Sequence, residues 1–403
     1  MSMLKRLIFF LPVLLIPACL EESTTALDEK AFTRIYDQDQ FNASFYSIDM
    51  RETADGGYVI LGGKHVETDG VVNAPLKIYL LKVDKFGNVV ADFELDENYV
   101  SPVPNLVQIN SRFYFFCMDQ STTAYLVSFD ERLENILTSQ LDVPLTFPLA
   151  ASIDNTSSQP GLLLLSYNDA DKESIVSRVS TGGSVSGQGA FHIGPGSPAD
   201  AMIIQHALRT GDQFPFSVGH TSTGLFYFNG FMNYTFSLVF TTLIDDNVSG
   251  TVNGQQENGG FSALLPITGS TFASSIFNFG SNFFLPKEAL SGGSTTDLQE
   301  SAFTFPELES NATVKIIHAV INDKNVLVYG SNTKSKQIAL YFYDETTEAL
   351  LGSEYIGYSN PFEISSIIQT TDGDLAVSGT THVAGRLPRF CLIKISRSSL
   401  KRI

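Results

Sequence analysis

Two stretches of this chain, more than 300 residues apart, share one pattern. Residues 52–65 read E-T-A-D-G-G-Y-V-I-L-G-G-K-H, and residues 369–382 read Q-T-T-D-G-D-L-A-V-S-G-T-T-H. Aligned without gaps, they match at three features: Asp55-Gly56 with Asp372-Gly373, Gly62 with Gly379, and His65 with His382. Two copies of one unit so far apart predict a repeat architecture, with weaker copies between them.

Each clear copy predicts short strands joined by tight turns. In the first copy, residues 46–51 alternate apolar and polar side chains, which is the period of a half-buried strand. Residues 58–61 and 78–83 are continuous apolar runs, and residues 89–95 alternate again. Four antiparallel strands in about 50 residues are the size of one propeller blade.

The turn residues of the repeat have a plain geometric interpretation. Gly accepts a positive φ without steric cost, and Asp-Gly is typical of tight hairpins. On that basis five residues of the first copy are assigned to turns rather than to a binding site: Asp55, Gly56, Gly62, Gly87 and Asn88.

Seven such units can be placed along the chain. The five weaker ones between the two clear copies are marked by residues 113–130, 162–179, 212–229, 264–285 and 323–344. In the fourth unit, Asp212 and Gly219 repeat the spacing of Asp55 and Gly62, which aligns Gly219 with the second strand. The fifth unit is the most degenerate, so six or eight units are the alternatives. Beyond the N-terminal 18 residues, no segment shows sustained helical periodicity.

The two ends of the chain complement each other. The last unit stops at residues 396–403 without a fourth strand, while residues 31–37 form an orphan strand before the first unit. Pairing the two would bury two sheet edges at once. The sequence therefore predicts an all-β fold over residues 31–403: a seven-bladed β-propeller of four-stranded antiparallel blades, whose N-terminal strand closes the last blade.

The composition and net charge limit the classes of partner that the protein can bind. A chain of 403 residues with 43% hydrophobic residues can bury a large core in one domain. Its formal net charge of −18 argues against nucleic acid as a partner and against adsorption on anionic lipid surfaces. A local cationic patch is compatible with that charge.

The N-terminus resembles a bacterial lipoprotein signal. Lys5 and Arg6 precede an apolar run, residues 7–18, that is too short to span a bilayer. The run ends in I-P-A-C, so residues 1–18 are expected to be removed and Cys19 to carry acyl chains, with residues 19–30 as a polar tether. An ordinary secretory signal with an incidental Cys is the alternative. Outer-membrane anchoring is expected, at the cell surface or on the periplasmic face.

The pattern D-G-G-Y … Y-L-L-K-V-D-x-x-G-N resembles the β-propeller repeats of secreted and envelope proteins of Bacteroidetes. The resemblance covers the first and last units, and elsewhere it covers only the spacing. The family's usual Trp is missing, since the chain has none. The resemblance implies a propeller fold and a cell-envelope location, and it implies no activity.

Two further cysteines, Cys117 and Cys391, fall in strands of non-adjacent units. A disulfide requires Cα atoms within about 7 Å, so both are expected to be free, buried thiols.

The candidate site lies on one loop face. Loops after the second strand emerge on the same side of every blade, and in units 6, 7 and 1 they carry mostly cationic side chains. The candidate ligand-binding residues are Lys64, His65, Lys77, Lys334, Lys336, His382, Arg386 and Arg389. Only Glu67 and Asp69 oppose them, and Arg386 with Arg389 could chelate a carboxylate. The alternative is a merely solvated rim.

These observations predict a non-enzymatic binding or scaffold module, because propellers present variable loops on a rigid ring. The expected partners are the membrane, through the lipid anchor, and an anionic glycan or an acidic protein loop. No cofactor, metal or catalytic residue is indicated. The competing hypothesis is a glycan-acting lyase or hydrolase that uses His and Tyr in the central funnel.

Overall fold

The computed structural model describes residues 31–37, 40–66, 74–210, 213–256, 258–298, 304–357, 360–400 and 403. The proposed signal peptide, residues 1–18, lies outside these residues, as do Cys19 and the tether of residues 19–30. The opposing carboxylates Glu67 and Asp69 also lie outside them.

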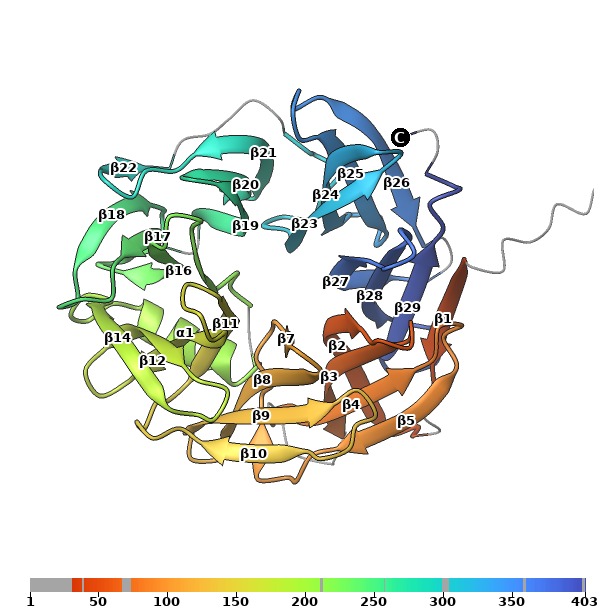
Figure 1. Cartoon of the computed structure of the whole chain (residues 1–403), viewed down its shortest axis with the longest axis horizontal. Coiled ribbons are helices and arrows are strands. Elements are labelled where there is room, and N and C mark those ends of the chain that lie inside the picture. Colours follow the sequence, from red (N-terminus) through yellow and green to blue (C-terminus); the bar gives the residue numbers. More distant parts are fainter. Residues whose placement is uncertain are drawn as a thin grey trace, which may run out of the picture.

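Antiparallel groups of strands follow one another around a central axis, as Figure 1 shows. The first group contains β2 (Ala43–Glu52), β3 (Tyr58–Val66), β4 (Lys77–Val83) and β5 (Val89–Glu94). The next contains β7 (Val107–Ile109), β8 (Arg112–Asp119), β9 (Ala124–Asp130) and β10 (Leu137–Gln140). The third contains β11 (Pro148–Asp154), β12 (Gly161–Asn168), β13 (Glu173–Val179) and β14 (Val185–His192).

The second half of the chain continues the same arrangement. The next group contains β15 (Ser217–His220), β16 (Phe226–Met232), β17 (Thr235–Thr241) and β18 (Val248–Asn253), with β22 (Thr295–Asp297) added parallel to β18. A three-stranded group contains β19 (Gly259–Thr268), β20 (Thr271–Asn278) and β21 (Ser281–Ala289). It is followed by β23 (Val314–Ile321), β24 (Lys324–Asn332), β25 (Ile338–Asp344) and β26 (Leu350–Ile356).

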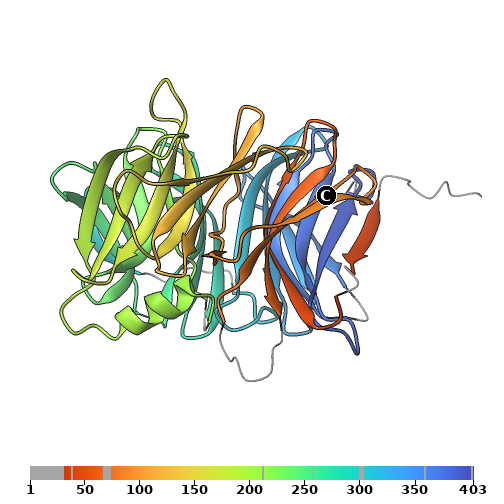
Figure 2. The ribbon, with the colours of Figure 1, turned by 90° about the horizontal axis from the view of Figure 1, so that it is seen from below.

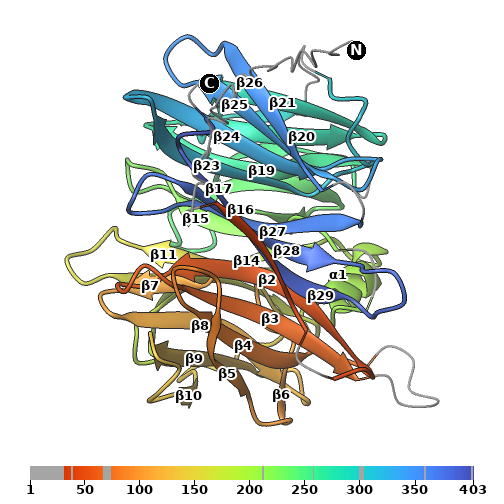
Figure 3. The same ribbon diagram turned by 90° about the vertical axis from the view of Figure 1, so that its right-hand side faces the viewer.

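The last group combines the two ends of the described chain. It contains β27 (Phe362–Gln369), β28 (Leu375–Thr381) and β29 (Arg389–Ile395), and β1 (Phe32–Tyr36) pairs antiparallel with β29 as the outermost strand. The pairing expected for residues 31–37 is therefore present. Figure 3 shows this side of the ring, where β2 and β3 run beside β27 and β28.

By hydrogen bonding these groups make six sheets. The first two groups count as one nine-stranded sheet, because β6 (Tyr99–Val100) pairs with both β4 and β8. The architecture is all-β and of the propeller type, with the first strand of each group nearest the axis (Figure 1).

The hydrophobic core lies between neighbouring groups. Phe390 of β29 reaches into the first group, where its ring lies 5.9 Å from that of Phe45. A Cβ on Gly62 would lie 2.1 Å from the Phe390 ring. Gly62 is inside β3 rather than in a turn, so its assignment to a turn is wrong. Gly56 and Gly87 do have a positive φ of 77°, as expected of turn residues.

The Asp of each clear repeat has a second role besides the turn. Lys82 Nζ lies 2.8 Å from Asp55 Oδ1, and Lys394 Nζ lies 2.8 Å from Asp372 Oδ2. Both lysines are buried, with 2% and 7% of their surface exposed. The shared sequence pattern therefore encodes one ion pair between the turn and the third strand, repeated in two neighbouring groups.

Two expectations about the middle of the chain are wrong. Residues 199–207 form the helix α1 (Ala199–Ala207), although nine residues gave too few turns for a helical period to stand out. In the fourth unit Gly219 lies in the first strand, β15, and not in the second. Residues 225–229 then fall at the second strand, β16, so the spacing from Asp212 to Gly219 was coincidental.

Cys117 and Cys391 are free and fully buried, as expected. In the part of the chain that the structure describes, no helix has the length and apolar character needed to cross a membrane.

Candidate functional site

Three of the four lysines of the predicted loop face lie close to carboxylates. Lys64 Nζ lies 2.5 Å from Glu94, which is also 3.9 Å from Lys77. Lys336 Nζ lies 2.6 Å from Glu309. Neither carboxylate could be paired with its lysine from sequence spacing alone. These charges are therefore largely compensated before any ligand arrives.

The fourth lysine, Lys334, has a hydrogen-bond partner, whereas Nε2 of His382 has none among the described residues. Lys334 donates to the carbonyl of Pro306 at 2.6 Å, and His382 Nε2 lies 3.6 Å from Glu363. His65 has no ion pair among the described residues. It is half-buried and lines a cavity at the centre of the ring.

The two candidate arginines, Arg386 and Arg389, contact the N-terminal segment around residues 37–43. Arg389 is 1% exposed and donates to the carbonyls of Ala43 at 2.7 Å and Gln40 at 3.0 Å. Both Arg389 and Arg386 also approach Asp37, at 3.3 and 3.6 Å. Arg389 is thus closed to an external ligand, and the carboxylate that the two arginines approach together is that of Asp37 in the chain itself rather than that of a ligand.

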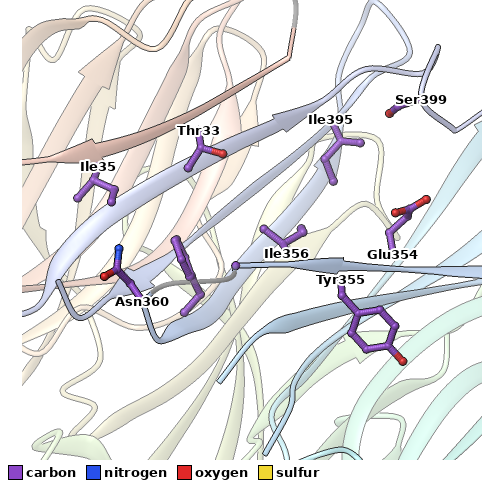
Figure 4. Close-up of a pocket in the computed structure, with 10 residues that line it drawn as sticks. Thr33, Ile35, Glu354, Tyr355, Ile356, Asn360, Ile395 and Ser399 are labelled. Atoms are coloured by element: carbon purple, nitrogen blue, oxygen red, sulfur yellow. The ribbon is translucent and has the colours of Figure 1, made fainter. Parts of the chain in front are cut away.

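A groove beside the N-terminal strand is a poor alternative site. It has a volume of about 440 Å³ and lies between β1, β26 and β27, with Thr33, Ile35 and Ile356 among its lining residues (Figure 4). None of its lining residues is a Lys, Arg or His. It offers no charge to attract an anion.

The centre of the ring holds a larger space, the central cavity, of about 720 Å³. It is lined by residues of the innermost strands β2, β11, β15, β19, β23 and β27 and of the segment that follows α1. Figure 2 shows α1 at one face of the ring, so the cavity reaches that face. A second cavity of about 530 Å³ shares four lining residues with it: Asn105, Lys315, Ile316 and Ser365.

The charged residues that line these two cavities are mostly cationic. They comprise Lys315 of β23, Arg209 just after α1, and Arg51 of β2, against one carboxylate, that of Asp49. On a chain with a net charge of −18 this is a local reversal of sign.

The carboxylate of Asp49 already accepts hydrogen bonds from the protein itself. It is 5% exposed, and it accepts hydrogen bonds from Leu106 N at 2.7 Å and Ser366 Oγ at 2.5 Å. Arg51 Nη1 lies 3.1 Å from the same carboxylate. A bulge between Ser47 and Asp49 lets the strand present Asp49 inward, against the alternation expected for residues 46–51.

The side-chain ammonium of Lys315 makes no hydrogen bond or ion pair with any described residue. Burial lowers the pKa of Lys315, while the nearby carboxylate of Asp49 acts in the opposite direction. Arg209 and Arg51 are close enough to lower it further. An ammonium group placed among other cations, with its nearest carboxylate already hydrogen-bonded, can interact favourably with an added negative charge.

The two terminal nitrogens of the Arg209 guanidinium are hydrogen-bonded, whereas its Nε is not. Its Nη2 donates to the carbonyl of Pro102 at 3.1 Å, and its Nη1 donates to Gln213 at 2.7 Å. Its Nε is buried and has no hydrogen-bond partner. Burial lowers the pKa of Arg209 to about 10, so the guanidinium still carries its charge at neutral pH.

His206 positions this segment rather than offering a charge. It is 2% exposed, and its Nδ1 accepts a hydrogen bond from Phe214 N at 3.0 Å. Burial lowers the pKa of His206 well below its usual value, and neighbouring Arg209 acts in the same direction. The imidazole is therefore neutral and anchors the chain after α1.

One carboxyl group lines the two cavities, among the described residues. Glycosidases generally use two carboxyl groups across the scissile bond, and only Asp49 is available among the residues lining the two cavities. Within the described residues, no group of three or more His, Cys, Asp or Glu side chains could hold a metal ion. Tyr46 and His65 do both line the central cavity, as the lyase hypothesis requires.

Sequence reasoning found one member of this site, His65, and missed Arg209, Lys315 and Arg51. A usable signal was present for one of them. Lys315 is the single charged residue in the apolar run V-K-I-I-H-A-V-I of an innermost strand. Arg209 had none, because only the folded path after α1 brings it to the axis.

Neither a family model nor a curated protein matches the sequence. Among solved structures, the chain is similar to the S. cerevisiae core factor, with a TM-score of 0.49 and 10% identity over 92% of this chain and 62% of that one. It is similar to the Dos1 propeller, with a TM-score of 0.48 and 10% identity over 91% of this chain and 94% of that one. The β-propeller domain of the Trilobed protease from Pyrococcus furiosus gives 0.45 and 9% over 88% and 95%.

The chain therefore spans less than two thirds of the core factor chain and nearly all of the other two. Identities this low say nothing about ligand or activity. Function has to be argued from the cavity.

Proposed function

We propose that this chain is a non-enzymatic binding protein whose central cavity holds an anionic ligand. The observation that carries the proposal is Lys315, an ammonium group in that cavity without a carboxylate partner of its own. Arg209, with its unpaired Nε, supplies a second cation to the same space. The loop-face cations named from the sequence then contribute mainly to stability and to the electrostatic field near the cavity.

The ring that carries this cavity is, on this proposal, a seven-bladed propeller. The nine-stranded sheet is counted as two blades, because β6 is only a two-residue bridge between β4 and β8. The remaining five sheets supply one blade each, and β1 closes the last of them. The three-stranded sheet of β19–β21 is then the degenerate fifth blade.

The cellular setting is part of the proposal. A lipid-anchored protein of the outer membrane, tethered through Cys19 and related to the Bacteroidetes repeat proteins, would display the ring beyond a polar linker. Radiolabelled palmitate incorporation into the wild type and into Cys19→Ala tests this arm. Equal labelling of both would refute the lipid anchor and leave the cavity proposal standing.

A thermal-shift and calorimetric titration tests the binding function. The probes are inorganic phosphate, trigalacturonate and decanoate, at low and at high salt. We expect at least one of them to raise Tm of the wild type, since a ligand that binds only the folded state stabilises it, by about 2.7 kcal/mol at a hundred times Kd. Lys315→Gln should lose this effect.

A matched control separates the cavity from general charge. Lys336→Gln removes one cation from the loop face, where Glu309 already pairs with it, and it should bind the same probe as the wild type does. If none of the three anions binds, or if both variants bind equally well, the proposed function is wrong. Turnover of any of a panel of polyuronates would favour the lyase instead.

A further inference from the structure

Several polar side chains in the wall of the central cavity are already hydrogen-bonded to one another or to the backbone. Ser365 Oγ donates to Ser47 Oγ at 2.7 Å, and Ser262 Oγ donates to Ser275 Oγ at 2.8 Å. Asn105 donates to the carbonyl of Ala151 at 2.6 Å. These side chains satisfy one another or the backbone. A ligand covered with hydroxyl groups would find few partners among them.

Much of the rest of the wall is apolar. It includes six large side chains from five parts of the chain: Ile48, Leu76, Phe214, Phe216, Leu264 and Ile316. Sites for small molecules commonly combine such a lining, in a volume of about 300–1,000 Å³, with a few placed polar groups. The central cavity lies within that range at about 720 Å³.

The unsatisfied polar groups of the wall include two cations, beside the neutral Ser217 Oγ and His206 Nε2. Arg209 Nε is buried without a partner, and Lys315 has none among the described residues. Both line the same cavity as the apolar side chains. The two kinds of surface together match a molecule with one anionic end and one apolar end.

We propose that the ligand is an amphipathic anion, such as a fatty acid or another compound with a carboxylate head and an apolar body, rather than a carboxylated glycan. The head lies against Lys315 and Arg209, and the body lies along Phe216, Leu264 and Ile316. This inference rests on the proposed function, which requires only that some anion bind in the cavity.

Calorimetric titration of the full chain with four probes tests the class of ligand. Decanoate, below its micelle concentration, has both parts; acetate has the head alone, 1-decanol the body alone, and trigalacturonate carries carboxylates on a polar body. We expect decanoate to bind at least tenfold more tightly than each of the other three.

Two variants separate the contributions of head and body. Lys315→Gln should weaken decanoate at least tenfold and leave 1-decanol unchanged. Leu264→Thr keeps a strand-forming residue in β19 and should weaken both decanoate and 1-decanol. If Lys315→Gln does not fold, as judged by its Tm, Arg209→Gln provides the same test of the head.

The failures can be told apart. Suppose that trigalacturonate binding requires Lys315 and that decanoate binds no more tightly than trigalacturonate. This result would contradict the amphipathic inference and support the proposed function. Decanoate binding that is unchanged in Lys315→Gln would show apolar partitioning and sink it too. Binding of none of the anions would overturn both proposals.

Discussion

Asp49 and Ser366 occupy the same position in the two clear copies of the repeat, and Ser366 Oγ donates a hydrogen bond of 2.5 Å to Asp49 Oδ1. The two residues lie on the innermost strands β2 and β27, which are neighbours across the join between the first and last groups. One copy supplies the acceptor and the other the donor. A repeat position has thus diverged into a pair that holds the ends of the ring together.

Removing this carboxylate should destabilise the ring. Asp49→Ala leaves the buried Leu106 N–H and the Ser366 hydroxyl without their acceptor, so we expect a loss of about 2–3 kcal/mol at pH 7. Urea denaturation measures it. Asp49→Asn keeps one acceptor and should lose less. A change within 0.5 kcal/mol for Asp49→Ala would contradict the assigned role.

Arg389 should stabilise the attachment of the N-terminal strand. Arg389→Leu leaves the carbonyls of Gln40 and Ala43 without their donor, and we expect a loss of about 2–3 kcal/mol. Hydrogen exchange should rise first in β1 and the facing residues of β29. Arg386→Leu, which removes a half-exposed side chain 3.6 Å from Asp37, is the matched control and should change stability little. Uniform exchange across the ring would argue against a local role for Arg389.

The repeated ion pairs predict a fall in stability at acid pH. Burial by itself raises the pKa of Asp55, but hydrogen bonds led by that of Lys82 lower it to about 2, and Asp372 with Lys394 behaves alike. A carboxyl whose pKa is depressed in the folded state adds stability above its unfolded pKa, about 4. That contribution is lost as pH falls from about 4 to about 2.

Urea midpoints at pH 7, 4 and 2.5 measure the effect. The double variant Asp55→Asn, Asp372→Asn should show a smaller drop between pH 4 and 2.5 than the wild type. Both carboxylates are well exposed, at 57% and 38% of their side chains, so salt should reduce the difference. Identical drops in the two proteins would show that other carboxyls dominate.

Gly62 should not tolerate a side chain. In Gly62→Ala the new Cβ would lie 2.1 Å from the Phe390 ring, and overpacking of this kind costs about 1–3 kcal/mol. Adding Phe390→Leu should make the double variant more stable than the two single losses predict. Gly182→Ala is the control, because its nearest neighbour would be 3.8 Å away and its φ is not positive. Strict additivity would mean that the clash is relieved elsewhere.

Much of the architecture could be predicted from the sequence, because turns and strands depend on the preferences of a few neighbouring residues. Asp55-Gly56 and Asp372-Gly373 encode turns, and the apolar runs that follow them encode strands, because hydrogen bonding and φ preference act over a few residues. The strand at residues 31–37 could also be predicted, because the last unit has an unpaired edge that needs a partner strand. Gly62 was misassigned because its neighbour, Phe390, lies on a different group of strands.

The candidate site depended on the tertiary structure. Lys64 and Glu94, or Lys336 and Glu309, are about 30 residues apart, and only the tertiary structure brings them within 2.6 Å. These ion pairs compensate much of the positive charge that we expected on the loop face from the sequence. Arg209 and Lys315, more than 100 residues apart, come to one cavity because the ring places the innermost strand β23 and the segment after α1 around a common axis. Periodicity specifies which way a side chain points from its own strand, and it carries no information about what faces it across the ring.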